Sequence, residues 1–132
     1  MKRLLFTGAL LLLTVLGLRA QSYVIRTEGE IPKEAEEVLV QRFTQMLEAG
    51  GLAVSEAGTP LTVGFEVKDR METPGSMSQV ALQLEIKAAA GEVEEVFPVK
   101  GVGENEADAW LRAVKQLLPR SKAARSFVEK LK

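Results

Sequence analysis

Two segments of this chain alternate apolar and polar residues with the period of two that is typical of a β-strand with one buried face. In residues 61–68 the apolar positions are Leu61, Val63, Phe65 and Val67. In residues 77–88 they are Val80, Leu82, Leu84 and Ile86. Because successive side chains of a strand point to opposite faces, each segment offers one face to a core and the other to water. The chain must therefore build a sheet that is covered on one side.

Amphipathic helices are predicted on both sides of these strands. The first helix begins near Pro32 and ends at Gly50 and Gly51, which suit a helix start and a helix stop. Asn105 is a predicted N-cap for a second helix, which Pro119 ends before a last amphipathic segment. In each of these two segments, the apolar residues recur at helical spacing and form one face. They are residues 110, 114 and 117 in the second helix and residues 124, 127, 128 and 131 in the last segment.

Further short strands complete the predicted order β-α-β-β-β-β-α-α. Residues 23–27 and 52–55 are rich in β-forming side chains. Residues 92–100 form a last strand, and its Pro98 predicts a position at a sheet edge or near its end. We therefore predict an α+β fold, an antiparallel sheet of about four to five strands with one face covered by two to three helices.

The N-terminal 20 residues are predicted to be a cleavable secretory signal peptide. Lys2 and Arg3 precede an apolar stretch, and Ala20 supplies a small residue at the cleavage point. The stretch from Leu4 to Leu18 is short for a membrane-spanning helix. We expect residues 21–132 to be a single exported domain, periplasmic or secreted, with no integral membrane span after cleavage. The absence of cysteine excludes both disulfides and a lipoprotein anchor on that residue type.

Catalytic and cofactor signatures are missing from the sequence. There is no histidine and no cysteine, so the commonest metal ligands and the commonest general base are absent, and we expect no metal and no cofactor. Glu92, Glu94 and Glu95 are interpreted as a solvated edge strand rather than as paired catalytic carboxylates. Gly101 and Gly103 match only a fragment of a phosphate-binding motif, and we interpret them as a flexible entry into the last helices.

Basic side chains are concentrated at the C-terminus. Residues 112–132 hold seven basic side chains and one acidic one, although the whole chain is slightly acidic. Arg120, Lys122 and Arg125 are candidate anion-binding residues for lipid headgroups or envelope polysaccharide. The alternative is that these cations complement helix ends and the acidic remainder of the domain. Nucleic acid is not an expected partner, because the chain is exported and net acidic and has one Trp and one Tyr.

The connection between the two alternating strands is the other candidate site. Residues 69–76 are predicted to form a long polar loop, and long loops on a rigid sheet often carry binding residues. Arg70, Met71 and Glu72 are its candidate partner-binding residues, with a charged and adaptable chemistry.

Two stretches resemble small accessory proteins of the bacterial envelope. Residues 43–55 (FTQMLEAGGLAVS) and 61–67 (LTVGFEV) resemble the helix, glycine stop and strands of penicillin-binding-protein activators and of the plug of the lipopolysaccharide transport machine. Residues 102–113 (VGENEADAWLRA) are similar to a glycine-led helix of flagellar-assembly and curli-channel lipoproteins. The resemblance implies an envelope location and no particular residue roles.

These observations favour an exported non-enzymatic accessory or binding domain of the bacterial envelope, with an envelope protein as its partner. Two alternatives stay open. One is a peripheral binder of anionic lipid or polysaccharide that uses the basic C-terminal helix. The other is a small carboxylate-dependent hydrolase. The sequence does not indicate the oligomeric state.

Overall fold

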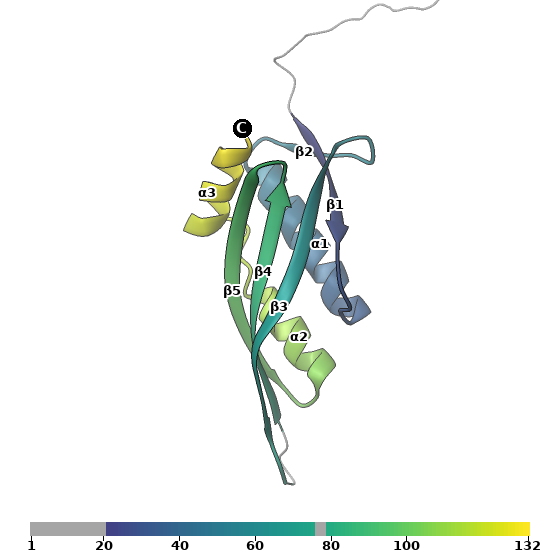
Figure 1. Ribbon diagram of the computed structural model, residues 1–132, viewed down its shortest axis with the longest axis vertical. Helices are drawn as coiled ribbons and strands as arrows, with labels where there is room; N and C mark the ends of the chain where they lie inside the picture. The colour runs from purple at the N-terminus through teal and green to yellow at the C-terminus, as the bar shows by residue number, and fades with distance from the viewer. Residues whose placement is uncertain (1–20, 76–78) are drawn as a thin grey trace, which may run out of the picture.

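The computed structural model describes residues 21–75 and 79–132, which form one sheet and three helices (Figure 1). The predicted leader, residues 1–20, lies outside the described residues. The elements in chain order are β1 (Ser22–Thr27), α1 (Lys33–Ala49), β2 (Ala53–Val54), β3 (Thr59–Thr73), β4 (Gln79–Ala90), β5 (Val93–Gly103), α2 (Glu106–Lys115) and α3 (Lys122–Leu131). This order and the α+β class confirm the prediction from the sequence.

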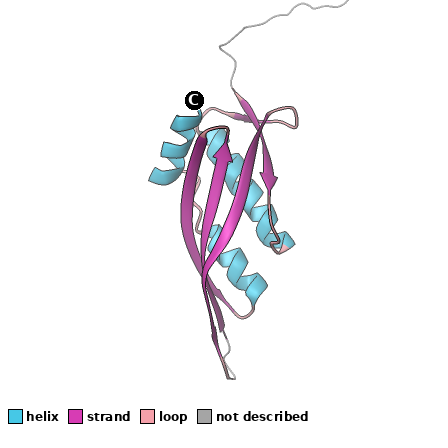
Figure 2. Cartoon of the chain, viewed as in Figure 1, coloured by secondary structure: helices cyan, strands magenta, loops and turns pink. Residues whose placement is uncertain are grey.

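All three helices lie on one face of the sheet, and the opposite face is open to solvent (Figures 1 and 2). The strand order is β2-β1-β3-β4-β5. On β4 every second residue is buried, from Val80 to Ala90, as its alternation predicts. The core lies between this face and the apolar sides of the helices, where Phe97 makes edge-to-face contacts with Phe43 and Phe127.

The sheet is mixed, so the prediction of a purely antiparallel sheet is wrong for its first strands. β1 runs parallel to both β2 and β3, whereas β3, β4 and β5 are antiparallel. The helix α1 is the reason for the β1–β2 pair, because a helix between two neighbouring strands returns the chain to the start of the sheet and makes the strands parallel. One-sided strands occur in both kinds of pairing, so alternation alone does not decide direction.

The predicted loop over residues 69–76 is wrong for residues 69–73, because β3 continues to Thr73 and pairs with β4 as far as Gln79. Pro74 and Gly75 are outside the strands, and residue 76 lies outside the described residues. The register shifts between Val67 and Asp69, where β3 contains a bulge. An extra residue in one strand exchanges the two faces of the strand, so the charged residues beyond the bulge do not continue the apolar alternation before it. This break in the pattern made the end of the strand resemble a loop.

The glycines at the end of β5 are sites of close helix packing and not a flexible entry. A Cβ atom on Gly101 would lie 2.4 Å from both the Ala109 carbonyl oxygen and the Ala113 nitrogen, and one on Gly103 would lie 2.6 Å from the Ala109 nitrogen. The backbone of α2 therefore rests directly on β5. Asn105 caps α2 by accepting a hydrogen bond from the Asp108 amide at 2.8 Å, as predicted.

The outer edge of the sheet at β5 is protected against pairing with another strand. Pro98 lies on this edge strand, as predicted, and has no amide hydrogen to donate. Two residues later, the Lys100 amide donates to the side chain of Gln116 at 3.2 Å. Both features discourage edge-to-edge association at β5. Among residues 21–75 and 79–132, no helix has the length and apolar character needed to cross a membrane.

Candidate functional site

The basic C-terminal segment divides into cations that are paired within the domain and cations that are not. Lys130 on α3 contacts Glu95 on β5, with 3.0 Å between the Nζ and Oε1 atoms. Arg112 pairs with Asp108 one helical turn earlier, at 3.2 Å. Lys132 pairs with Glu129, also at 3.2 Å. The pairs with Glu95 and Asp108 agree with the interpretation that part of the segment complements the acidic remainder of the domain, whereas Glu129 belongs to the segment itself.

The candidate anion-binding residues are not part of that pairing. Arg120, Lys122 and Arg125 are exposed, and none of them has an ion pair within the part of the chain that the structure describes. Arg120 and Arg125 line the same hollow, whereas Lys122 is not among its lining residues. The structure thus brings together two of the three residues selected from the sequence.

We call this hollow the α1–α3 groove, and it encloses about 560 Å³. It lies between the end of α1, the connection from α2 to α3, and α3 itself. The lining residues are Met46, Ala49, Gly50, Pro119, Arg120, Arg125, Val128 and Glu129. A second hollow adjoins it, shares Ala49, Pro119 and Arg120, and adds Glu48 and the exposed Leu118. The groove therefore combines an apolar surface with two guanidinium groups.

Gly50 explains why α3 approaches α1 so closely at the groove. A Cβ atom on Gly50 would lie 2.2 Å from Val128 Cγ1, so any other residue would force the Val128 side chain to shift. Gly51, at φ +86, turns the chain out of the helix in a conformation that favours glycine. The glycine stop that the sequence predicts is confirmed, and it also shapes the floor of the groove.

The electrostatic setting of the groove is that of a helix C-terminus. The last turn of α1 has no basic residue of its own, although cations are favourable at that end. Arg120 and Arg125 bring positive charge there from another part of the chain. Arg42, one turn before Met46, has a buried Nε atom without a hydrogen-bond partner in the described part of the chain. Two arginines from another part of the chain therefore lie at this end of α1.

The candidate partner-binding residues Arg70, Met71 and Glu72 lie on β3, where neighbouring side chains point to opposite faces of the sheet. Arg70 pairs opposite Leu82, on the helix side of the sheet, and its Nε atom lies 2.9 Å from Glu106 Oε1 at the start of α2. The hydrogen bond to Glu106 raises the pKa of Arg70. Glu72 lies 3.2 Å from the same guanidinium. Two of the three residues are thus engaged with each other and with α2.

Met71 faces the other way, onto the open face of the sheet. It pairs opposite Ala81, which in turn pairs opposite Val102, so the three residues form one row across β3, β4 and β5. Met71 and Val102 are exposed. This row is small, and a single row of apolar side chains on a surface is common in proteins that bind nothing there.

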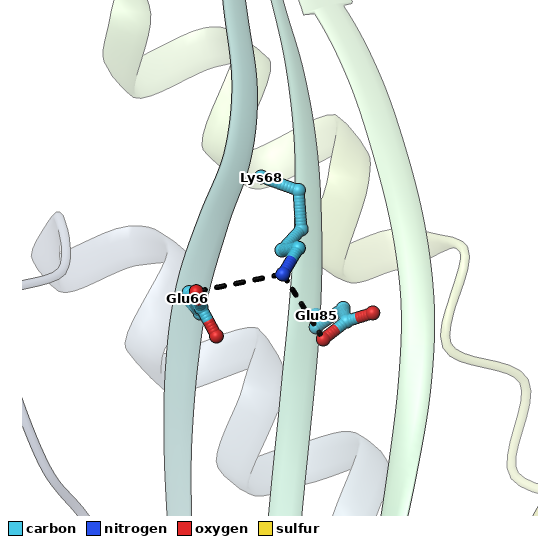
Figure 3. A network of polar contacts seen from close by, with 3 residues as sticks. All are labelled: Glu66, Lys68 and Glu85. Carbon is cyan, nitrogen blue, oxygen red and sulfur yellow. Dashed lines mark hydrogen bonds and ion pairs between the residues drawn. The ribbon is translucent and has the colours of Figure 1, made fainter.

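Elsewhere on the sheet, two carboxylates lie opposite each other with a lysine between them. Glu66 and Glu85 lie opposite each other on the open face, and Lys68 lies between them at 3.5 and 3.9 Å (Figure 3). Like charges directly opposite destabilise a sheet, so the lysine offsets that repulsion. No group of three or more possible metal ligands is found in residues 21–75 and 79–132.

Trp110 belongs to the core, as predicted. The residue is 6% exposed, and its ring lies edge to face with that of Phe65, with 5.4 Å between the ring centres. What the sequence could not indicate was the groove, because its residues come from three elements. The spacing of glycine at the end of α1 and arginine after Pro119 gives no sign that they meet.

Comparisons with known proteins add little to this geometry. The chain matches no protein-family model and no curated protein. Solved structures that align with it include a minor lipoprotein from Acinetobacter baumannii, at 11% identity over 84% of this chain and 88% of that chain, with a TM-score of 0.37. A PelC dodecamer from Paraburkholderia phytofirmans aligns at 12% identity over 84% and 79%, with a TM-score of 0.35. A hypothetical protein from Chlamydia trachomatis aligns at 10% identity over 86% and 95%, with a TM-score of 0.36. Likenesses at these TM-scores carry no functional argument.

Proposed function

We propose that this chain is an exported, non-enzymatic accessory domain of the bacterial envelope that binds a protein partner through the α1–α3 groove. The leader-like residues 1–20 support export. A sequence without histidine or cysteine favours binding over catalysis. The observation that carries the proposal is that Arg120 and Arg125, which have no ion pair among the described residues, line one hollow together with apolar residues.

The position of these arginines prepares the groove for an anionic group. Both lie at the C-terminal end of α1, where a cation is favourable by about 0.3–1 kcal/mol. That attraction lowers the cost of holding two like charges near each other before a ligand arrives. A ligand that meets charges already in place loses less free energy to ordering the site.

A protein partner suits the groove better than a lipid bilayer or an extended polysaccharide. Glu129 lines the groove and Glu48 lines the adjoining hollow, so carboxylates stand on the same surface as the arginines. A broad anionic surface would meet these acids as well as the two cations. Lys122, which would add to a lipid-binding surface, lies outside the groove lining. Anionic lipid or polysaccharide is therefore the second candidate, and the experiment below separates it from the first.

The test is capture of a partner from envelope extract of the source bacterium by the purified exported protein. The wild type is compared with the double variant Arg120→Gln/Arg125→Gln and with Lys115→Gln as a matched control. Lys115 is an exposed cation near the end of α2 that does not line the groove. All three proteins should unfold at similar temperatures, because the changes are at exposed positions.

We expect one protein to be retained by the wild type and by Lys115→Gln, and to be lost from the double variant. Equal retention by all three proteins would overturn the groove as the binding surface. Recovery of phospholipid or polysaccharide alone, with the same dependence on the arginines, would overturn the protein partner and support the second candidate.

A further inference from the structure

We infer that the α1–α3 groove takes the free carboxyl end of a polypeptide chain whose last side chain is apolar. This inference rests on the proposed function and names the chemical group that the groove recognises. It follows from four properties of the groove: the kind of cation, the apolar floor, the volume, and the acids on the same surface.

The cations are both arginines, whose planar guanidinium groups match a carboxylate. Each guanidinium can donate two parallel hydrogen bonds to the two oxygens of one carboxylate. Arg120 comes from the connection before α3 and Arg125 from the first half of α3, so they approach the groove from different elements. A carboxylate between them can be held by both.

The floor of the groove accepts an apolar side chain beside that carboxylate. Four apolar residues line the hollow: Ala49 is exposed and Pro119 is half-buried, whereas Met46 and Val128 are 1% and 4% exposed. Methionine adapts its shape to what packs against it. Gly50 also lines the hollow, and its lack of a side chain lets Val128 pack closely against the end of α1. A chain end presents this combination, one carboxylate and one side chain on the same carbon atom.

The size of the groove suits a chain end and not a folded element. Its volume of about 560 Å³ falls within the range of roughly 300–1,000 Å³ that is usual for small-ligand sites. A helix or a sheet surface would cover the groove without filling it. A few terminal residues in extended form can enter it.

The acids limit the negative charge that the groove accepts. Glu129, which lies 3.2 Å from the Lys132 ammonium, and Glu48 in the adjoining hollow repel a second anionic group. A phosphate dianion or a run of acidic residues would therefore be less favourable than one carboxylate. With two arginines and two nearby glutamates, the groove should therefore bind the single carboxylate of a chain end in preference to a polyanion.

The test uses a library of short random peptides, immobilised through their N-termini and probed with the purified exported protein. One copy of the library carries free carboxyl ends, and a second copy with the same sequences is amidated. We expect binding to peptides whose last residue is apolar. Hydrogen bonds to charged groups contribute about 1.5–3 kcal/mol, so amidation should weaken binding by roughly ten- to a hundredfold. Arg120→Gln and Arg125→Gln should each lose affinity, whereas Lys115→Gln should not.

Equal binding of the free and amidated peptides, or selection of internal acidic residues regardless of the chain end, would overturn the inference. So would the absence of any binding peptide. If the arginine variants still lose the captured protein from the extract in any of these cases, the proposed function stands and only the chain-end recognition fails. If the arginine variants retain that protein as well, both proposals fail together.

Discussion

Replacing Gly101 by alanine should force α2 away from β5 and destabilise the whole domain. The added Cβ atom would lie 2.4 Å from the Ala109 oxygen and from the Ala113 nitrogen, whereas ordinary contacts begin at 3.4 Å. The obstacles are backbone atoms, so no side chain can rotate out of the way. The helix has to move by about 1 Å, a gap that forfeits roughly a quarter to a half of the dispersion energy of each facing contact.

The expected loss follows from what α2 buries. Trp110 and Val114 are its large buried residues, and Ala109 and Ala113 add smaller contributions. Full burial of a large apolar side chain is worth about 1.5–3 kcal/mol, so the helix contributes roughly 6 kcal/mol in total. Losing a quarter to a half of that gives a destabilisation of about 1.5–3 kcal/mol. A domain has only about 5–15 kcal/mol of stability to lose.

Urea unfolding followed by tryptophan fluorescence measures this loss directly, because the single tryptophan lies on α2. Gly64→Ala is the matched control, since Gly64 is also a strand glycine, yet the nearest atom to its added Cβ is Glu28 Oε1 at 3.9 Å. The control should be neutral or stabilising by up to about 1 kcal/mol. If Gly101→Ala unfolds at the same urea concentration as Gly64→Ala, α2 does not rest on β5 as described.

The remaining predictions concern the core, the contact between β1 and the end of α3, and α1. Leu84 is 1% exposed, so Leu84→Ala should cost about 2–5 kcal/mol in urea unfolding, and a loss below about 1 kcal/mol would mean that β4 presents its other face. Tyr23 Oη donates to the Leu131 carbonyl oxygen at 3.1 Å, and Tyr23→Phe should cost about 1 kcal/mol. Burial raises the pKa of Tyr23 in the folded state, so the unfolded chain loses this proton at a lower pH. The stabilisation linked to the neutral phenol is therefore complete below pH about 10 and is lost as the pH rises through the pKa of the folded state. A pH titration of stability should show that decline in the wild type and not in Tyr23→Phe; equal slopes would contradict it. Arg42→Met should leave the melting temperature unchanged or raise it, because it removes an unpartnered buried N–H; a clear fall would mean that the guanidinium has an essential partner.

Much of the fold could be predicted because its information is local. The alternation in residues 80–86 specifies β4 and its buried face, and Pro98 specifies an edge. The direction of β1 could not be predicted from its own residues, because pairing with β3 is set by where α1 returns the chain. A helix between the first two strands was the available evidence for parallel pairing.

The end of β3 and the glycines of β5 were misinterpreted for different physical reasons. In β3, a one-residue bulge exchanges the strand faces, and Arg70 on the helix side is stabilised by Glu106 from a distant segment. In β5, Gly101 and Gly103 alternate in step with the buried Phe97 and Val99. That spacing, together with the small residues of the following helix, was sequence evidence for close packing.

The most direct test of the account is photo-crosslinking in living cells from a photoreactive amino acid placed at position 49. Ala49 is exposed and lines both the α1–α3 groove and the adjoining hollow, whereas Lys87 is an exposed control on the open face of the sheet. We predict one protein adduct from position 49, no adduct from position 87, and loss of the adduct when Arg120 and Arg125 are both changed to glutamine. An adduct from position 87 with none from position 49, or an adduct that survives the loss of both arginines, would contradict binding through the groove.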